Sequence, residues 1–279
     1  MNVTKGPGRF LLIALLAFGV CTIAQALEIS GPQRQGGLLE GQVPAGSRVQ
    51  ALGHDIPVAE DGRFLLGLGR DAPASIAVSV MLPSGEEQLH HLSITAREYD
   101  IQRIDGLPSN QVSPDAETLK RIRRDNALVG QARAKTVSEP LFAAGWIWPV
   151  TGPISGVYGS QRILNGQPRQ PHYGIDIAMP TGTPVLAPSD GIVTLAEPDL
   201  FFSGGTMIID HGQGLSSTFL HLSEMLVEVG DPVSQGEVVA RVGATGRVTG
   251  AHLDWRMNWF DQRIDPSLLV PPMQEAMAR

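Results

Sequence analysis

Two short segments of the chain, about eighty residues apart, each combine a histidine with an aspartate at a spacing suited to metal binding. His172 stands four residues before Asp176, and His252 stands two residues before Asp254. Ligands four residues apart can converge on one ion across a tight bend, and residues two apart point to the same face of a strand. Imidazole nitrogen and carboxylate oxygen are both ordinary ligands of Zn²⁺. The sequence therefore predicts a metal site.

The segments that hold these residues are predicted to be strands in a mainly β chain. The 279 residues include 32 Gly and 21 Pro, aromatic residues make up only 5%, and short apolar runs alternate with turn residues. This mix favours many short strands over long helices. The strands predicted for the metal-bearing part are 175–178, 184–187, 191–196, 206–210, 215–222, 238–242 and 252–257.

The pattern of turns and apolar runs divides the chain into five parts. Residues 1–26 are a predicted signal peptide, and 27–106 are a predicted accessory domain, a small β-sandwich with strands near 46–53, 63–68, 74–82 and 88–95. Residues 107–140 form a linker with a helix over 113–136, for which Ser113 suits the N-cap and Pro114 the first turn. We expect this helix to connect the accessory domain to the metal-bearing domain at 141–270, which a C-terminal tail at 271–279 follows.

The first 26 residues have the three regions of a secretory signal peptide. Lys5 and Arg9 precede an apolar run over 10–23, and Ala24-Gln25-Ala26 fits the small-x-small cleavage pattern. The run is shorter than the roughly 20 residues that span a bilayer. We therefore expect export to the periplasm or cell envelope, with no membrane span after cleavage. Retention of the segment as an uncleaved anchor is the alternative.

The expected net negative charge of the mature chain argues against nucleic acid as a partner. Cleavage would remove two of the 21 basic residues and none of the 28 acidic ones, so the net charge would change from −7 to −9. Such a chain is a poor candidate for binding nucleic acid, whose phosphates require basic side chains. The only cysteine would also be lost, so no disulfide is expected.

An ordered series of motifs over about 125 residues resembles the lysostaphin-type, or LytM-like, zinc metallopeptidases that cut peptidoglycan peptides. The series includes His172-Tyr-Gly-Ile-Asp176, Pro180-Thr-Gly-Thr-Pro184, Asp210-His-Gly212, Leu220-His221-Leu222-Ser223, Gly243-Ala-Thr-Gly246 and Gly250-Ala-His252-Leu-Asp254. The resemblance implies an antiparallel β-roll domain with a groove over the metal. The β-rich part with a helix that precedes it resembles the accessory regions found before such domains.

The resemblance also implies roles for individual residues. His172 and Asp176 match two zinc ligands, and His221 and His252 match the catalytic histidines. The family's third ligand is the second histidine of a His-x-His pair, where this chain has Asp254. Carboxylate oxygen also binds zinc, at about 2.0–2.2 Å, so Asp254 is the predicted third ligand.

The aspartate at 254 changes the expected charge of the site. Two carboxylates and one neutral imidazole would leave a zinc site formally neutral, whereas two histidines and one aspartate leave about +1. A less positive site predicts a weaker Lewis acid, and hence a slower enzyme or a more alkaline pH optimum. His211, in Asp210-His-Gly212, is expected to be a turn residue and not a ligand.

Two functional hypotheses stay open on the sequence alone. The first is an exported zinc metalloendopeptidase that hydrolyses peptide cross-links of peptidoglycan in cell-wall remodelling. The second is a non-catalytic LytM-like module that binds cell wall or activates a cell-wall amidase, with divisome proteins as further partners. The joint presence of four matching site residues favours the enzyme. The loop over 162–171 directly precedes His172 and could line or cover its groove.

Overall fold

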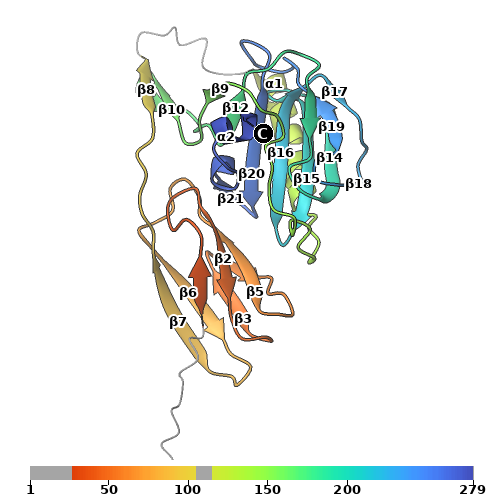
Figure 1. Ribbon diagram of the computed structural model, residues 1–279. Helices are drawn as coiled ribbons and strands as arrows, with labels where there is room; N and C mark the ends of the chain where they lie inside the picture. The colour runs from red at the N-terminus through yellow and green to blue at the C-terminus, as the bar shows by residue number, and fades with distance from the viewer. Residues whose placement is uncertain (1–26, 105–114, 279) are drawn as a thin grey trace, which may run out of the picture.

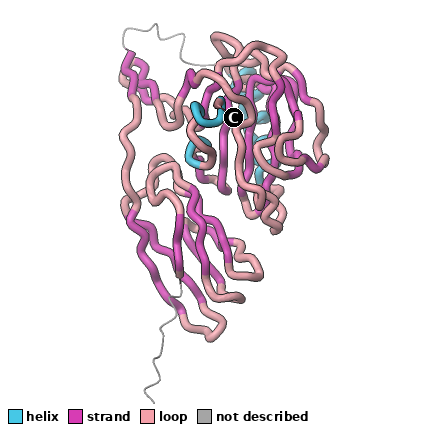
Figure 2. The backbone as a smooth tube through the Cα atoms, in the orientation of Figure 1, coloured by secondary structure: helices cyan, strands magenta, loops and turns pink. Residues whose placement is uncertain are grey.

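The computed structural model describes residues 27–104 and 115–278, and strands dominate both parts (Figures 1 and 2). The mainly β fold class predicted from the sequence is confirmed. The predicted signal peptide lies outside the described residues. Within the described ranges, every helix is too short or too polar to cross a membrane.

The N-terminal region consists of two antiparallel sheets that share one buried hydrophobic cluster. The first has the order β1-β2-β5, with bounds Glu28–Ser30, Leu38–Gln42 and Arg63–Gly67. The second has the order β4-β3-β6-β7, with bounds His54–Ile56, Arg48–Ala51, Ser75–Met81 and Glu87–Ser93. Alternate residues of β6, Ile76, Val78 and Val80, are buried, because one face of this sheet lies on the core.

An eight-stranded sheet forms the centre of the C-terminal region. Its strands follow the order β18-β14-β15-β16-β20-β12-β9, and β21 pairs with β20. Their bounds are Pro232–Val233 (β18), Gly191–Leu200 (β14), Gly204–Gly212 (β15), Leu215–Leu222 (β16), Leu253–Trp259 (β20), Gly174–Ile177 (β12), Ile154–Gly156 (β9) and Gln262–Ile264 (β21). All neighbouring pairs are antiparallel, as the resemblance to a β-roll implies.

One face of this large sheet packs on the main hydrophobic core. Trp255, Met257 and Trp259 alternate along β20 and are fully buried there, next to Phe219 of β16. A three-stranded sheet in the order β13-β19-β17 contributes to the same core, with bounds Pro184–Leu186, Val238–Arg241 and Glu224–Met225. The residues that alternate with these on β20 are polar and point to the opposite face of the sheet, which we call the polar face.

Helix α1, at Ala116–Arg133, lies on the polar face of the large sheet, behind β14 and β15 in Figure 1. The helix packs Ala132 against Leu195 and Ile208 of these two strands. Its buried Asp125 accepts a hydrogen bond from the Phe201 N–H at 2.8 Å. The helix expected to connect the two domains also covers, near its C-terminal end, part of the sheet that carries the candidate site.

The helix begins later than predicted. Asp115 is its N-cap, and the Asp115 carboxylate accepts a hydrogen bond from the Thr118 N–H at 2.8 Å. A carboxylate at this position satisfies a free N–H of the first turn. Ser113 and Pro114, the predicted cap and first residue, lie outside the described residues.

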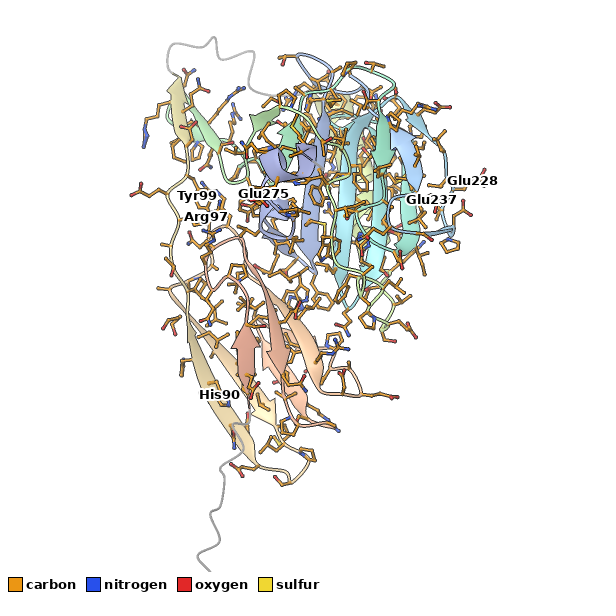
Figure 3. All side chains as sticks on the ribbon, viewed as in Figure 1. His90, Arg97, Tyr99, Glu228, Glu237 and Glu275 are labelled. Atoms are coloured by element: carbon orange, nitrogen blue, oxygen red, sulfur yellow. The ribbon has the colours of Figure 1, made fainter. Side chains whose placement is uncertain are left out.

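A further small sheet, of three strands, joins the two regions at the upper left of Figure 1. Strand β8, Ile101–Ile104, pairs in parallel with β10, Gln161–Leu164, which pairs with β11, Gln167–Pro168. The segment before β8 carries Arg97 and Tyr99, labelled in Figure 3, and Arg97 Nη1 donates to Asp265 Oδ2 at 2.8 Å. The predicted loop over 162–171 is therefore largely a hairpin that is held by the N-terminal region.

The chain ends in two short helical segments beside the main core. They are the 3₁₀ helix η2 at Pro266–Leu268 and helix α2 at Met273–Met277. The side chain of Trp148 donates from Nε1 to the Pro271 carbonyl at 2.8 Å, and Met273 is buried. Part of the predicted C-terminal tail is thus packed structure.

Candidate metal centre

Strand register brings the candidate ligands together on the polar face. Strands β12 and β20 are adjacent and antiparallel, and Asp176 stands directly opposite Asp254. Directly opposed residues of an antiparallel pair point to the same face of the sheet. Glycine is required at 174 on β12, because a Cβ there would collide with Asp254 Oδ1. The close approach of these two strands therefore depends on both the register and the glycine.

His172 completes a group of three potential ligands with Asp176 and Asp254, whose ligand atoms all lie within 4.8 Å of one another. His172 Nε2 is 3.2 Å from Asp176 Oδ1, yet neither of these buried atoms has a hydrogen-bond partner among the described residues. Two atoms bound at about 2.1 Å to one tetrahedral zinc ion lie about 3.4 Å apart. Buried polar atoms normally have partners, so this unpaired nitrogen and oxygen fit a shared cation.

The electrostatics of the group also suit a cation. Burial alone would lower the pKa of His172, but the carboxylates of Asp176 and Asp254 outweigh burial and raise this pKa. The same negative field that stabilises an imidazolium would stabilise a metal ion in its place. A metal ion would require His172 to be neutral, so binding should release a proton at acidic pH.

The structure adds one residue that sequence reasoning missed, Arg256. Its Nε lies 3.0 Å from both carboxylate oxygens of Asp254, and its Nη2 lies 2.5 Å from Oδ2. Burial would raise the pKa of Asp254, but the Arg256 guanidinium outweighs burial and lowers it. Each carboxylate oxygen has two lone pairs, so Asp254 can accept these hydrogen bonds and still bind a metal ion.

Arg256 changes the charge count on which the sequence prediction of a neutral site was based. With the guanidinium included, a site in which His172, Asp176 and Asp254 hold Zn²⁺ has a formal total charge of +1. This is the charge of a site built from two histidines and one aspartate. The spacing of Asp254 and Arg256, two residues apart on one strand, was a signal in the sequence that could have revealed the pair.

The two candidate catalytic histidines lie beside the ligand group, and Nδ1 of each ring contacts a backbone carbonyl. His221 Nδ1 is 2.9 Å from the Thr245 carbonyl oxygen, and His252 Nδ1 is 2.9 Å from the Gly250 carbonyl oxygen. A carbonyl only accepts, so each neutral ring has its hydrogen on Nδ1 and a lone pair on Nε2. The ring centroids are 4.8 Å apart, and His252 Nε2 lies 3.8 Å from Asp176 Oδ1. Both rings are therefore oriented to exchange protons at Nε2.

His221 has two features typical of a functional residue. Its φ is +65°, in the left-handed region that non-glycine residues seldom adopt, so the surrounding structure must hold it there. Burial lowers its pKa despite the Thr245 carbonyl, which acts in the opposite direction. His221 is therefore neutral at pH 7 and able to accept a proton.

His211 is not in the ligand group, and its predicted turn position was wrong. It lies near the end of β15, fully buried, with Nδ1 2.7 Å from the Asp190 carbonyl oxygen and Nε2 2.7 Å from Ser217 Oγ. The neutral imidazole uses both contacts, as a donor at Nδ1 and an acceptor at Nε2. Burial lowers the pKa of His211 to about 4. His211 is thus a structural residue.

This buried histidine predicts a pH-dependent loss of stability. Because its pKa falls from 6.5 to about 4 on folding, its contribution is complete above pH 6.5 and is lost as the pH falls toward 4. With a chelator present, urea denaturation of the wild type should show a loss of about 2 to 3 kcal/mol from this group between pH 7.5 and 4.5. The His211→Asn variant should show a correspondingly smaller pH dependence, and an unchanged dependence would contradict the assignment.

Comparisons with known proteins agree with this geometry. Residues 170–266 match the sequence profile of "Peptidase family M23". This range includes all the candidate site residues. A crystal structure of a Pseudomonas aeruginosa protein assigned to peptidase M23 is 30% identical, with a TM-score of 0.64. The match covers 85% of this chain and 94% of that protein. The chain therefore belongs to peptidase family M23.

Two curated relatives match part of this chain. Peptidoglycan DD-endopeptidase ShyA of Vibrio cholerae is 42% identical over 87 residues, which are 31% of this chain and 20% of ShyA. An uncharacterized metalloprotease of Haemophilus influenzae is 33% identical over 174 residues, which are 62% of this chain and 32% of that protein. The chain thus spans between a fifth and a third of the length of these relatives.

Proposed function

We propose that this protein is an exported zinc metalloendopeptidase that hydrolyses peptide cross-links of peptidoglycan. The observation that carries the proposal is the convergence of His172, Asp176 and Asp254 beside the rings of His221 and His252, with His252 Nε2 3.8 Å from Asp176 Oδ1. The name of the relative ShyA supports peptidoglycan as the substrate. The signal-peptide pattern of residues 1–26 supports export to the periplasm or cell envelope.

The proposed chemistry divides between the metal and the histidines. When bound, zinc would supply Lewis acidity toward the scissile carbonyl and lower the pKa of water in the site. His221 and His252 would carry the proton transfers: a neutral ring would accept the proton of the attacking water at Nε2, and the imidazolium formed would donate that proton to the leaving amine. The Thr245 and Gly250 carbonyls hold the two rings in the tautomer that these transfers need.

The domain division proposed from the sequence assigns the peptidase function to residues 141–270. Residues 27–106 would be an accessory domain, and 107–140 would join it to the peptidase domain. The contacts of α1 with β14 and β15 extend the functional unit to include this helix. Arg70 Nε of the accessory domain donates a hydrogen bond to the carbonyl of Gly159, just before β10, at 2.9 Å. This contact supports a fixed position of the accessory domain beside the peptidase domain.

One observation favours the alternative function of a non-catalytic module. Both carboxylate oxygens of Asp254 already accept hydrogen bonds from Arg256, and this contact could compete with a metal ion. Such a module would act by binding peptidoglycan or a cell-wall amidase. The unpaired Nε2 of His172 and Oδ1 of Asp176 favour the metal-binding enzyme, because an abandoned site has no reason to retain two buried unsatisfied atoms.

Digestion of purified peptidoglycan tests the proposal. The zinc-loaded protein should convert cross-linked muropeptide dimers to monomers with new free amino and carboxyl ends, identified by mass spectrometry. A chelator should stop the conversion, and added Zn²⁺ should restore it. Dimers left intact by a protein that holds one equivalent of zinc would overturn the enzyme and favour the non-catalytic module.

A further inference from the structure

Three arginines form a row on the polar face, beginning beside the candidate metal centre. Arg256 on β20 lies directly opposite Thr218 of β16, and Arg133, from the last turn of α1, donates from Nη2 to Thr218 Oγ1 at 3.2 Å. Two residues further along β20, Asn258 lies opposite Arg263 of β21 and accepts from its Nη1 at 2.9 Å. Segments far apart in the sequence therefore bring Arg133, Arg256 and Arg263 together.

Two of these arginines have no acidic partner. Asp254 neutralises Arg256. Among residues 27–104 and 115–278, the guanidinium groups of Arg133 and Arg263 have no carboxylate oxygen within 4.0 Å. The Nε atom of Arg133 is buried and has no hydrogen-bond partner in this part of the chain. Buried guanidinium nitrogens normally have an acceptor. The Nε of Arg133 and the charges of both arginines therefore lack the anionic partner that would complete an ion pair.

The surroundings of the two arginines point to an anionic ligand. Thr218 and Asn258 form a buried polar floor, while Arg133 and Arg263 themselves are only partly buried. Burial, and to a smaller extent the positive charges of Arg263 and Arg256, lower the pKa of Arg133 to about 9. The pKa of Arg263 is lowered by burial and then by Arg256. A bound anion would remove both the unmatched charge and the mutual repulsion.

We propose that Arg133 and Arg263 form a subsite for a free carboxylate of the peptide substrate. The inference rests on the proposed peptidase function and names its substrate class, a peptide that carries a negative charge close to the cleaved bond. Residues two apart on a strand are about 6.6 Å apart, so Asn258 lies about 13 Å along β20 from Asp254. The carboxylate would therefore bind about three to four residues of extended peptide from the scissile bond.

The energetic expectation follows from the strength of charged hydrogen bonds. A hydrogen bond to a charged group contributes roughly 1.5–3 kcal/mol, which corresponds to about 10- to 100-fold in binding or in kcat/KM. Planar guanidinium donors match the two oxygens of a carboxylate, so lysine should replace them only in part. Loss of either arginine should reduce the preference for a carboxylate without changing the chemistry at the metal.

The test compares two forms of one substrate. Soluble cross-linked muropeptide dimers are used with their carboxylates free, and after amidation with carbodiimide and ammonia. The wild type should cleave the free form about 10- to 100-fold better in kcat/KM. Arg133→Gln and Arg263→Gln should each reduce this ratio toward one, because each lowers kcat/KM for the free form more than for the amidated form. Arg123→Gln, an exposed position on the same helix, is the matched control and should keep the wild-type ratio.

Further measurements separate this proposal from folding defects and from the proposed function. Melting temperatures identify unfolded variants, and Arg133→Lys should keep an intermediate ratio. Calorimetric binding of the same two dimers to the His221→Ala protein reports the carboxylate preference even if no form of the protein hydrolyses peptide. The proposal would be overturned if both glutamine variants fold and keep the wild-type preference for the free over the amidated dimer, measured as a ratio of kcat/KM or of binding affinity. These arginines would then have a purely structural role.

Discussion

Replacement of His221 by alanine is expected to lower kcat for peptidoglycan cross-link hydrolysis by about 10²- to 10⁴-fold, with zinc content unchanged. His221 is outside the ligand group but directs Nε2 toward it, because Nδ1 is held by the Thr245 carbonyl. Loss of the ring therefore removes a proton-transfer group and leaves the three ligands in place. Steady-state kinetics on muropeptide dimers, with zinc quantified in the same sample, measures both effects.

Two control variants make the His221 result specific. His91→Ala removes an exposed histidine of β7 and should have wild-type kinetics. His252→Ala should also lower kcat and retain zinc, since the ring of His252 lies 4.8 Å from that of His221. A His221→Ala protein that is folded, holds zinc and has kcat within about threefold of wild type would exclude His221 from proton transfer.

Replacement of Asp254 by asparagine is expected to weaken zinc binding by at least about 100-fold and to destabilise the fold by about 3 kcal/mol. The asparagine amide is a poor zinc ligand. The substitution also removes the only carboxylate that lies close to the Arg256 guanidinium among the described residues. Competition with a chromophoric chelator measures the zinc affinity. Urea denaturation in the presence of chelator measures the stability without a contribution from zinc.

A double variant separates the two consequences of losing Asp254. Asp254→Asn with Arg256→Gln removes both charges, so the stability should recover while zinc binding stays weak. Asp254→His alone should give a poor site, because Arg256 then adds an unbalanced positive charge beside the ion. The combination of Asp254→His with Arg256→Gln should bind zinc more tightly than Asp254→His. Wild-type zinc affinity in Asp254→Asn would remove Asp254 from the ligand set.

The strands that carry the site were predictable because their signal is local. Apolar runs bounded by turn residues located β16 and β20, and the spacing of His252 and Asp254 suggested that both point to the same face of one strand. The register that sets Asp176 opposite Asp254 depends on contacts between distant segments, so spacing alone could suggest it but not fix it. The resemblance of the motifs supplied the remaining long-range information.

Apart from the Asp254–Arg256 pair, the main features that the sequence did not predict depend on packing between distant segments. The predicted helix did not show which sheet face α1 covers, where Ala132 meets Ile208. Arg133 lies near the end of this helix, and its contact with Thr218, 85 residues further along the chain, has no local signal. His211 has a turn-like neighbourhood in sequence, but its burial is decided by strand pairing.

The most direct test of the metal centre is a crystal structure of the protein grown with one equivalent of Zn²⁺, with anomalous scattering measured at the zinc edge. The account predicts one anomalous peak, bonded to the His172 imidazole and to one oxygen each of Asp176 and Asp254 at about 2.0–2.2 Å, with Arg256 still paired to Asp254. A peak elsewhere, or an ion bound by His172 and Asp176 while Asp254 contacts only Arg256, would contradict the proposed ligand set.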